Sequence, residues 1–195
     1  MEKKYLITAS LLDAWKYLLN NEQSDFDAFL RVLRREPSET NIYQEQGFKF
    51  EKWAEENYPE TQHGEYQVKL YKDIRVNNTN YLLYGIVDCI KGGIVYDYKH
   101  TNKYDVGKFY DKAQTSMYLE LVPQAAAFKY IIAIDTPNYI DSSEPYIIYT
   151  ESYTRNEIPK IQNIIRNFES WLIQTNLINE YKKYWEAKWN KYQTK

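Results

Sequence analysis

Cysteine and histidine are the scarcest chemically reactive side chains in this sequence of 195 residues. Because Cys89 is the single cysteine, the chain can form neither an internal disulfide nor a four-cysteine zinc or iron–sulfur site. The two histidines, His63 and His100, are too few to favour a histidine-based hydrolase or zinc centre. This cysteine usage fits an intracellular protein, and we expect a cytoplasmic location.

Long apolar runs and a strong excess of charge are also missing. No stretch of about 18 consecutive apolar residues occurs, so we expect no transmembrane helix and no membrane partner. Residues 1–10 are charged and lack the apolar core of a signal peptide. The formal net charge of -2 argues against a protein that coats DNA, which would be strongly basic. It does not exclude a nuclease, because such an enzyme needs carboxylates for its metal.

The sequence is rich in apolar and aromatic side chains. Hydrophobic residues make up 44% of it and tyrosines number 21, which is enough for a packed core. Periodicity and capping signals predict helices at about residues 8–20, 24–36 (capped by Ser24), 41–57, 106–122, 154–172 and 176–192. Alternating or continuous apolar runs predict strands at about residues 65–76, 81–90, 94–98, 126–134 and 146–150.

This order of elements predicts the α/β class, with a central mixed β-sheet, flanking helices and helical additions at both ends. No linker or repeat interrupts residues 1–195, so we expect one domain. Its parts are a helical N-terminal segment (1–60), a core containing the sheet (about 61–152) and C-terminal helices (about 154–193). Thr154 and Glu157 form a capping-box pattern that should open the first of these C-terminal helices.

Gly92-Gly93 is a strong signal for a two-residue hairpin turn between two predicted strands. Such a turn places residues equally distant from it opposite each other, so Asp88 should face Asp97 at a non-hydrogen-bonded position. The Cβ atoms of such a pair are about 4.5–5.5 Å apart. Residues two apart share a face, which puts Lys99 beside Asp97.

Two facing carboxylates repel each other, and burial among apolar neighbours would raise the pKa of one of them. A hard divalent cation compensates both charges, because Mg²⁺ takes one or two carboxylates and keeps water ligands for a phosphate. Lys99 would then hold the attacking water or stabilise charge on that phosphate. The plainer interpretation is a surface hairpin with solvated aspartates and a lysine partner. The apolar residues around Asp88 and Asp97 favour the metal site.

Several short motifs, in this order and spacing, resemble one branch of the PD-(D/E)XK nuclease superfamily, the RecB-like and lambda-exonuclease-like branch. Residues 85–88 (GIVD), 94–99 (IVYDYK) and 114–118 (QTSMY) are similar to its Gly-x-x-Asp strand, Asp/Glu-x-Lys strand and Gln-x-x-x-Tyr helix. Residues 10–15 (SLLDAW) resemble its serine-led opening helix, and residues 47–51 (GFKFE) a helix that supplies an extra metal ligand. The resemblance implies a restriction-endonuclease-like core and Mg²⁺- or Mn²⁺-dependent hydrolysis of DNA.

The resemblance also assigns roles to particular residues. The catalytic set is Asp88, Asp97, Lys99 and Gln114; the metal ligands are Glu51, Asp88 and Asp97; Tyr118 binds substrate. Gln114 and Tyr118 are four apart and so share a helix face, although such a helix could simply pack on the sheet with Gln114 at its polar margin. Glu45, Glu55 and Glu56 compete with Glu51, and an acidic helix face is usually just solvated.

The sequence departs from the family pattern at two points. Val87 stands where some members have proline, and the four cysteines of an iron–sulfur cluster are absent. The implied function is a deoxyribonuclease of phage or bacterial origin, an exonuclease or recombination and repair enzyme. Its partners would be DNA and a recombination or replication protein, in a bacterial or phage-infected cell. The alternative is a catalytically silent module of the same fold that binds nucleic acid or a protein.

Three other features attract attention but have plainer explanations. By strand alternation His100 and Cys89 should face away from Lys99 and Asp88, and Cys89 fits a buried apolar position better than a nucleophile. Lysines and aromatic residues interleave along 176–192, a pattern that could bind phosphates and stack on bases. We favour an amphipathic helix with an aromatic core face and a solvated lysine face.

Overall fold

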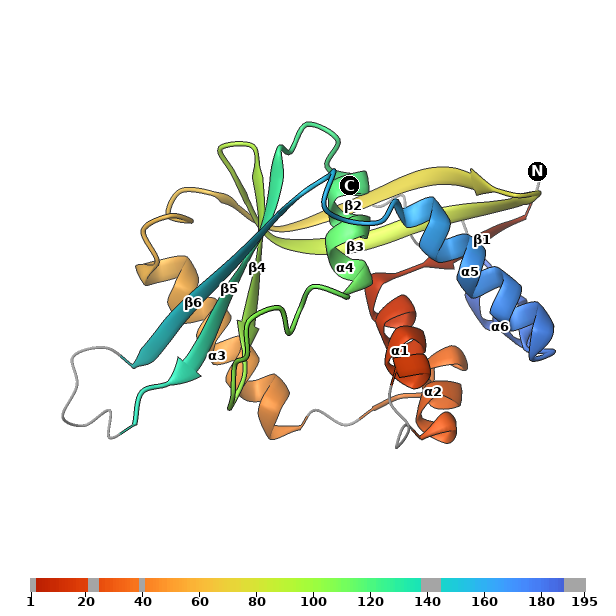
Figure 1. Ribbon diagram of the computed structural model, residues 1–195, viewed down its shortest axis with the longest axis horizontal. Helices are drawn as coiled ribbons and strands as arrows, with labels where there is room; N and C mark the ends of the chain where they lie inside the picture. The colour runs from red at the N-terminus through yellow and green to blue at the C-terminus, as the bar shows by residue number, and fades with distance from the viewer. Residues whose placement is uncertain (1–2, 21–24, 39–40, 138–144, 188–195) are drawn as a thin grey trace.

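The computed structural model describes residues 3–20, 25–38, 41–137 and 145–187 (Figure 1). Helices and strands follow one another as β1 (Lys4–Ile7), α1 (Ala9–Asn20), α2 (Phe26–Leu33), α3 (Ile42–Asn57), β2 (Glu65–Val76), β3 (Thr79–Lys91), β4 (Ile94–His100), α4 (Ala113–Leu121), β5 (Ala127–Asp135), β6 (Tyr146–Thr154), α5 (Ile161–Gln174) and α6 (Ile178–Trp185). None of the helices described has both the length and the apolar character needed to span a membrane.

The strands form one six-stranded mixed sheet, which confirms the expected α/β class. Its order is β1-β3-β4-β5-β6, and β2 pairs with β3. The β1–β3 and β4–β5 pairs are parallel, and the β2–β3, β3–β4 and β5–β6 pairs are antiparallel. In Figure 1, β2 and β3 extend together away from β5 and β6, towards β1, α5 and α6.

The sheet forks along β3. Strand β2 pairs with β3 from Thr79 to Ile90 and therefore occupies one of its edges. On the other edge, β1 pairs with residues 80–83, whereas β4 pairs with residues 89–91. Residues 84–88 of β3 thus lie between the departing ends of two strands. A fork of this kind opens the sheet locally and leaves room for side chains of a covering helix.

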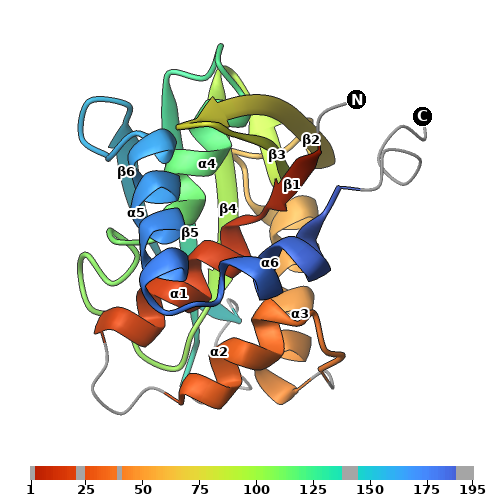
Figure 2. The same ribbon diagram turned by 90° about the vertical axis from the view of Figure 1, so that its right-hand side faces the viewer.

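Helices cover both faces of β4 and β5. One apolar cluster holds Met117 of α4 with Phe128 and Ile132 of β5, together with side chains of α1, α5 and α6. The other holds Phe50 of α3 with Tyr98 of β4. Figure 2 shows β4 between α5 on one side and α3 on the other. Successive strand residues alternate between the two clusters, so residues of β4 that face α4 and residues that face α3 alternate as well.

Strand β1 is absent from the sequence-based expectations. Its four residues, KYLI, follow a charged start and are too short to show a two-residue period. The strand forms because β3 supplies a parallel partner, from Lys4 opposite Asn80 to Ile7 opposite Leu83. The Thr8 hydroxyl then accepts a hydrogen bond from Leu11 N at 3.3 Å, which begins α1 directly after the strand.

Two predicted helices are wrong in their extent. Residues 106–112 form turns, and α4 begins only at Ala113. The capping-box pattern at Thr154 forms in part, since Glu157 Oε2 accepts a hydrogen bond from Thr154 N at 2.7 Å. Helix α5 nevertheless begins at Ile161, because Pro159 interrupts the segment and β6 continues to Thr154.

The other boundaries differ less. Helix α2 takes Asp25 as its N-cap, and the predicted cap Ser24 lies outside the described residues. Helix α6 ends at Trp185, earlier than predicted, and Glu186 forms an isolated bridge to Tyr5. The lysines and aromatic residues predicted beyond it at 188, 189, 191, 192 and 195 also lie outside the described part of the chain.

Candidate active site

The hairpin of β3 and β4 has the register that the Gly92-Gly93 turn predicts. Lys91 pairs with Ile94, Ile90 with Val95 and Cys89 with Tyr96. The backbone ladder ends there, so the expected backbone pairing of Asp88 with Asp97 is wrong in this one respect. The strands separate because the Asp88 carboxylate takes the place of a main-chain acceptor: Tyr98 N donates to Asp88 Oδ2 at 3.0 Å.

The carboxyl groups of Asp88 and Asp97 nevertheless meet, close enough to hydrogen-bond to each other. Both therefore project into the same space, as the hairpin geometry predicts. Asp97 is 1% exposed, which makes it one of the few buried charged side chains in the described residues. Lys99 Nζ lies 2.6 Å from Asp97 Oδ2 and 5.8 Å from the centre of the Tyr130 ring.

Gln114 comes from the first turn of α4 and donates a hydrogen bond from Nε2 to Asp97 Oδ1. Gln114 therefore contacts Asp97 directly, and it lines the same pocket as Lys99. The other carboxylate oxygen, Asp97 Oδ2, receives no hydrogen bond of standard geometry from the described residues. Lys99 Nζ lies 2.6 Å from it as an ion pair, and a carboxylate oxygen with this single neighbour keeps capacity for a further ligand.

Burial dominates the electrostatics of the acidic pair. It raises the pKa of Asp88 to about 8, with a further contribution from the charge of Asp97 and an opposing one from Tyr98 N. It also raises the pKa of Asp97, against the effect of the Lys99 ammonium group. Burial acts to lower the pKa of Lys99, but Asp97 and Asp88 outweigh it and the net shift is upward. Without a cation, a proton shared between the carboxyl groups is therefore favoured.

Tyr118 packs into the fork of the sheet. Its hydroxyl donates to Ile86 O at 2.7 Å, and its ring lies against Gly85. A Cβ atom at position 85 would be 2.6 Å from Tyr118 Cε1, so only glycine fits this approach. Gly85 has the role of admitting Tyr118 to the fork. The GIVD motif contains this glycine, but the sequence does not reveal its partner.

A pocket of about 420 Å³ opens at the fork. Its lining comes from α1 and the residue before it, from β3, from β4 and from α4: Thr8, Ala9, Ser10, Asp13, Tyr84, Gly85, Ile86, Lys99, Gln114 and Tyr118. The pocket joins four of the motifs in the family resemblance. Asp13 is the one acidic residue of this lining, and sequence reasoning gives it no role of its own.

Glu51 does not join the acidic pair directly. It lies on α3, which packs on the face of β4 opposite to α4, and its carboxylate accepts a hydrogen bond from Gln67 Nε2. Burial, followed by the charges of Glu55 and Asp97, raises the pKa of Glu51, so its carboxylate is close enough to sense the site. Its role as a metal ligand stays a prediction. Among the described residues no group of three or more acidic, histidine or cysteine side chains is arranged to hold a metal.

The expectations about Cys89 and His100 are confirmed. Cys89 is buried with Tyr96 and Tyr98 on the face that α3 covers, away from Asp97. His100 lies on that same face, where its Nε2 is 3.0 Å from Asp135 Oδ1 and its ring contacts Tyr146. Both side chains therefore face away from Lys99.

The donor set suits one class of cation. Two carboxylates, one of which has an unsatisfied buried oxygen, could hold a hard divalent cation that retains water among its ligands. Mg²⁺ and Mn²⁺ are of this kind. A zinc site built from cysteine and histidine does not fit, because Cys89 and His100 lie on the other face of the sheet.

No protein-family model matches the chain, and no curated protein matches it. Solved structures of similar fold do exist. One is the protein SSO0001, with a TM-score of 0.55 and 18% sequence identity over 90% of this chain and 79% of that one. Another is a phage-related exonuclease from Haemophilus somnus 129PT, with a TM-score of 0.54 and 14% identity over 93% of each chain. At these identities the likeness shows the fold alone.

Proposed function

We propose that the chain is a metal-dependent deoxyribonuclease of the PD-(D/E)XK type, whose catalytic residues are Asp88, Asp97, Lys99 and Gln114. The observation that carries the proposal is the meeting of Asp88 and the buried Asp97 beside Lys99, which lines the pocket together with Gln114. Buried like charges destabilise a fold unless an opposite charge compensates them, and a bound cation would supply that charge. The fold shared with a phage-related exonuclease supports the same class of reaction.

Each residue would contribute a separate part of the reaction. Asp88 and Asp97 would hold Mg²⁺ or Mn²⁺, which when bound polarises the phosphate and makes a bound water more acidic. Lys99 would orient the attacking water or stabilise the charge that develops on phosphate. Gln114 keeps the Asp97 carboxylate in place through Oδ1 and leaves Oδ2 beside Lys99 Nζ. Tyr118 shapes the substrate side of the pocket.

The substrate we propose is DNA, cut from an end. The support for an exonuclease is the fold likeness to the Haemophilus somnus protein and the motifs of the lambda-exonuclease-like branch. A recombination or replication protein as partner, and a phage or bacterial origin, rest on the same resemblance.

One observation favours the silent module as a second candidate. Lys99 already neutralises Asp97 at 2.6 Å, so the pair could persist as a structural ion pair without metal. Such a module would bind DNA or a protein without catalysing a reaction.

Incubation with linear and circular duplex DNA, in Mg²⁺, Mn²⁺ or EDTA, distinguishes the two candidates. We expect metal-dependent loss of linear DNA, abolished by Asp88→Asn. The matched control is Asp105→Asn, which removes a carboxylate that is 70% exposed. DNA binding with no cleavage in either metal would favour the silent module. Cleavage of circular DNA would contradict the exonuclease assignment but not the nuclease.

A further inference from the structure

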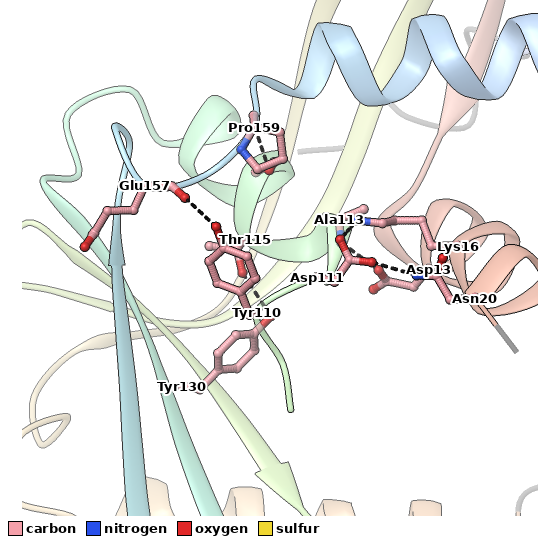
Figure 3. Close-up of polar contacts among 11 residues, drawn as sticks. Asp13, Lys16, Asn20, Tyr110, Asp111, Ala113, Thr115, Tyr130, Glu157 and Pro159 are labelled. Atoms are coloured by element: carbon pink, nitrogen blue, oxygen red, sulfur yellow. Dashed lines mark hydrogen bonds and ion pairs between the residues drawn. The ribbon is translucent and has the colours of Figure 1, made fainter. Parts of the chain in front are cut away.

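Asp13 is a partly buried carboxylate with an unusual partner. It lies on α1, lines the same pocket as Lys99 and Gln114, and accepts a hydrogen bond from Ala113 N through Oδ1 at 2.7 Å. Figure 3 shows this contact between α1 and the start of α4. The two residues are 100 positions apart in the chain. The bond is therefore a tertiary contact that sequence-local capping rules cannot reveal.

The contact acts as an external cap of α4. The first N–H groups of a helix have no partner within it, and the local N-cap residue, Lys112, provides no side-chain hydrogen bond. Asp13 supplies the missing acceptor from another helix, and its negative charge also suits the positive end of the helix dipole. The N-terminal end of α4 is thus fixed by α1.

Gln114 is the very next residue after Ala113. A displacement of Ala113 N must move the backbone of Gln114, whose Nε2 donates to Asp97 Oδ1. The chain of contacts runs from Asp13 through Ala113 and Gln114 to Asp97. Because Gln114 lies in the first turn of α4, little helix separates the cap from this contact.

Other contacts of α4 lie farther along the helix. Ser116 Oγ donates to Pro159 O at 2.8 Å, and Thr115 Oγ1 lies 3.0 Å from Tyr130 Oη (Figure 3). Arg155 donates to Val122 O at the other end, at 2.8 Å. These bonds hold the helix against β5 and the segment before α5, but none of them precedes Gln114. On the side of Gln114, Lys16 and Asn20 of α1 also bind Asp111 in the segment before α4 (Figure 3). Among these contacts from α1, only that of Asp13 reaches a residue of α4 itself.

We propose that Asp13 is a positioning residue, which fixes the first turn of α4 so that Gln114 meets Asp97. Its hydrogen bond to Ala113 N performs this task, and its charge is secondary. The catalytic consequence rests on the proposed nuclease function, whereas the positioning itself is a property of the metal-free fold. The substitution Asp13→Asn keeps an oxygen acceptor for Ala113 N, and Asp13→Ala removes it.

Two NMR signals test the positioning without any activity. The Ala113 amide should exchange slowly with solvent in the wild type and in Asp13→Asn, and rapidly in Asp13→Ala, since no other acceptor among the described residues serves it. The side-chain amide signals of Gln114, identified by their absence in Gln114→Ala, should move in Asp13→Ala and stay in place in Asp13→Asn. Unmoved Gln114 signals in a folded Asp13→Ala protein would overturn the proposal.

Cleavage kinetics test the consequence. Asp13→Ala should lower kcat by about 10-fold or more with little change in KM for DNA, because misplacement of a catalytic group acts on the chemical step. Asp13→Asn should restore most of this loss. The double variant Asp13→Ala/Gln114→Ala should be within about 2-fold of Gln114→Ala alone, since Asp13 acts through Gln114. The proposal would be overturned if the double variant lost kcat by the product of the two single losses. It would also be overturned if Asp13→Asn were as slow as Asp13→Ala.

A matched control separates positioning from general loosening of the helix. Ser116→Ala removes one hydrogen bond from the same helix, and should lower stability about as much as Asp13→Ala while leaving the Gln114 signals in place. If Asp13→Ala is unfolded, the Asn variant and the Gln114 signals still decide the matter, because a charge-based role predicts that Asn fails. A wild type that does not cleave DNA refutes the proposed function and leaves the NMR test of Asp13 intact.

Discussion

Replacement of Asp88 by asparagine should stabilise the metal-free protein, and the size of the gain should depend on pH. An aspartate in an unfolded chain has a pKa of about 3.9. In the folded chain, burial and the charge of Asp97 raise the pKa of Asp88 to about 8. The folded protein therefore keeps a proton that the unfolded chain releases. Stability of the wild type falls as the pH rises from about 4 to about 8, because the unfolded state binds fewer protons in that window.

Asparagine escapes this penalty since it ionises in neither state. Its side-chain oxygen can still accept from Tyr98 N, and its amide can donate to Asp97 in place of the shared proton. One pKa unit corresponds to about 1.4 kcal/mol, so the whole shift sets an upper bound of about 6 kcal/mol. Relaxation and water entry reduce this, and we expect a gain of about 2–4 kcal/mol at about pH 8. The difference should vanish near about pH 4, where both states of the wild type are protonated.

Magnesium should narrow the stability difference between the two proteins. The cation needs ionised carboxylates, so it should stabilise the wild type by about 1–3 kcal/mol when its concentration is well above Kd. The Asp88→Asn protein should gain little. Urea unfolding at constant ionic strength, with EDTA or Mg²⁺, measures both effects. Asp105→Asn, at an exposed position, serves as the control and should change stability by less than about 0.5 kcal/mol.

The reasoning is refuted if Asp88→Asn is less stable than the wild type at about pH 8 in EDTA. That result would mean that Asp88 is ionised and stabilised in the fold, as in a structural ion pair. Equal stabilisation of both proteins by Mg²⁺ would refute the metal assignment separately, because the cation would then bind without Asp88.

Three further substitutions test other parts of the site. Lys99→Met should slow cleavage at least about 100-fold yet increase the stabilisation by Mg²⁺, because it removes a positive charge 2.6 Å from Asp97 Oδ2; weaker Mg²⁺ stabilisation in thermal melts would contradict this. Gly85→Ala should cost about 1–3 kcal/mol in urea unfolding, since the new Cβ would lie 2.6 Å from Tyr118 Cε1, and a negligible cost would refute the close approach. Lys112 lines two pockets that also contain Asp13. Lys112→Ala should therefore reduce the salt dependence of DNA binding, measured as the slope of the logarithm of the binding constant against the logarithm of salt concentration, by up to about 1. Lys52→Ala on α3 is its control, and an equal effect of both would refute a local phosphate contact.

The hairpin is the part of the site that sequence reasoning predicts best. Side chains on a strand alternate with a period of two, and a Gly-Gly turn fixes the register, so the meeting of Asp88 and Asp97 follows from counting. The end of the ladder at Cys89 does not follow. It depends on the Asp88 carboxylate taking the Tyr98 N–H, a choice between two acceptors that residue numbers do not encode.

The missed strand β1 and the wrong start of helix α4 have a different cause. Strand β1 forms because it pairs with an edge of β3, and its four residues are too few to show the two-residue period that predicts a strand. Helix α4 begins at Ala113 rather than near 106, although the apolar spacing continues through Phe109 and Tyr110. In both cases tertiary contacts decide the boundary. Propensity within a short window cannot express such contacts.

The pocket at the fork depends on these same long-range contacts. The fork of β3 exists because β1 and β4 take different stretches of one edge, and the fork admits Tyr118 only where Gly85 leaves space. Asp13 then fixes the start of α4 above it, from a residue far away in the chain. The motifs supply the reactive groups, whereas their alignment comes from residues with no reactive role. Substitutions at Gly85 or Asp13 should therefore impair the site while every motif carboxylate and Lys99 remain present.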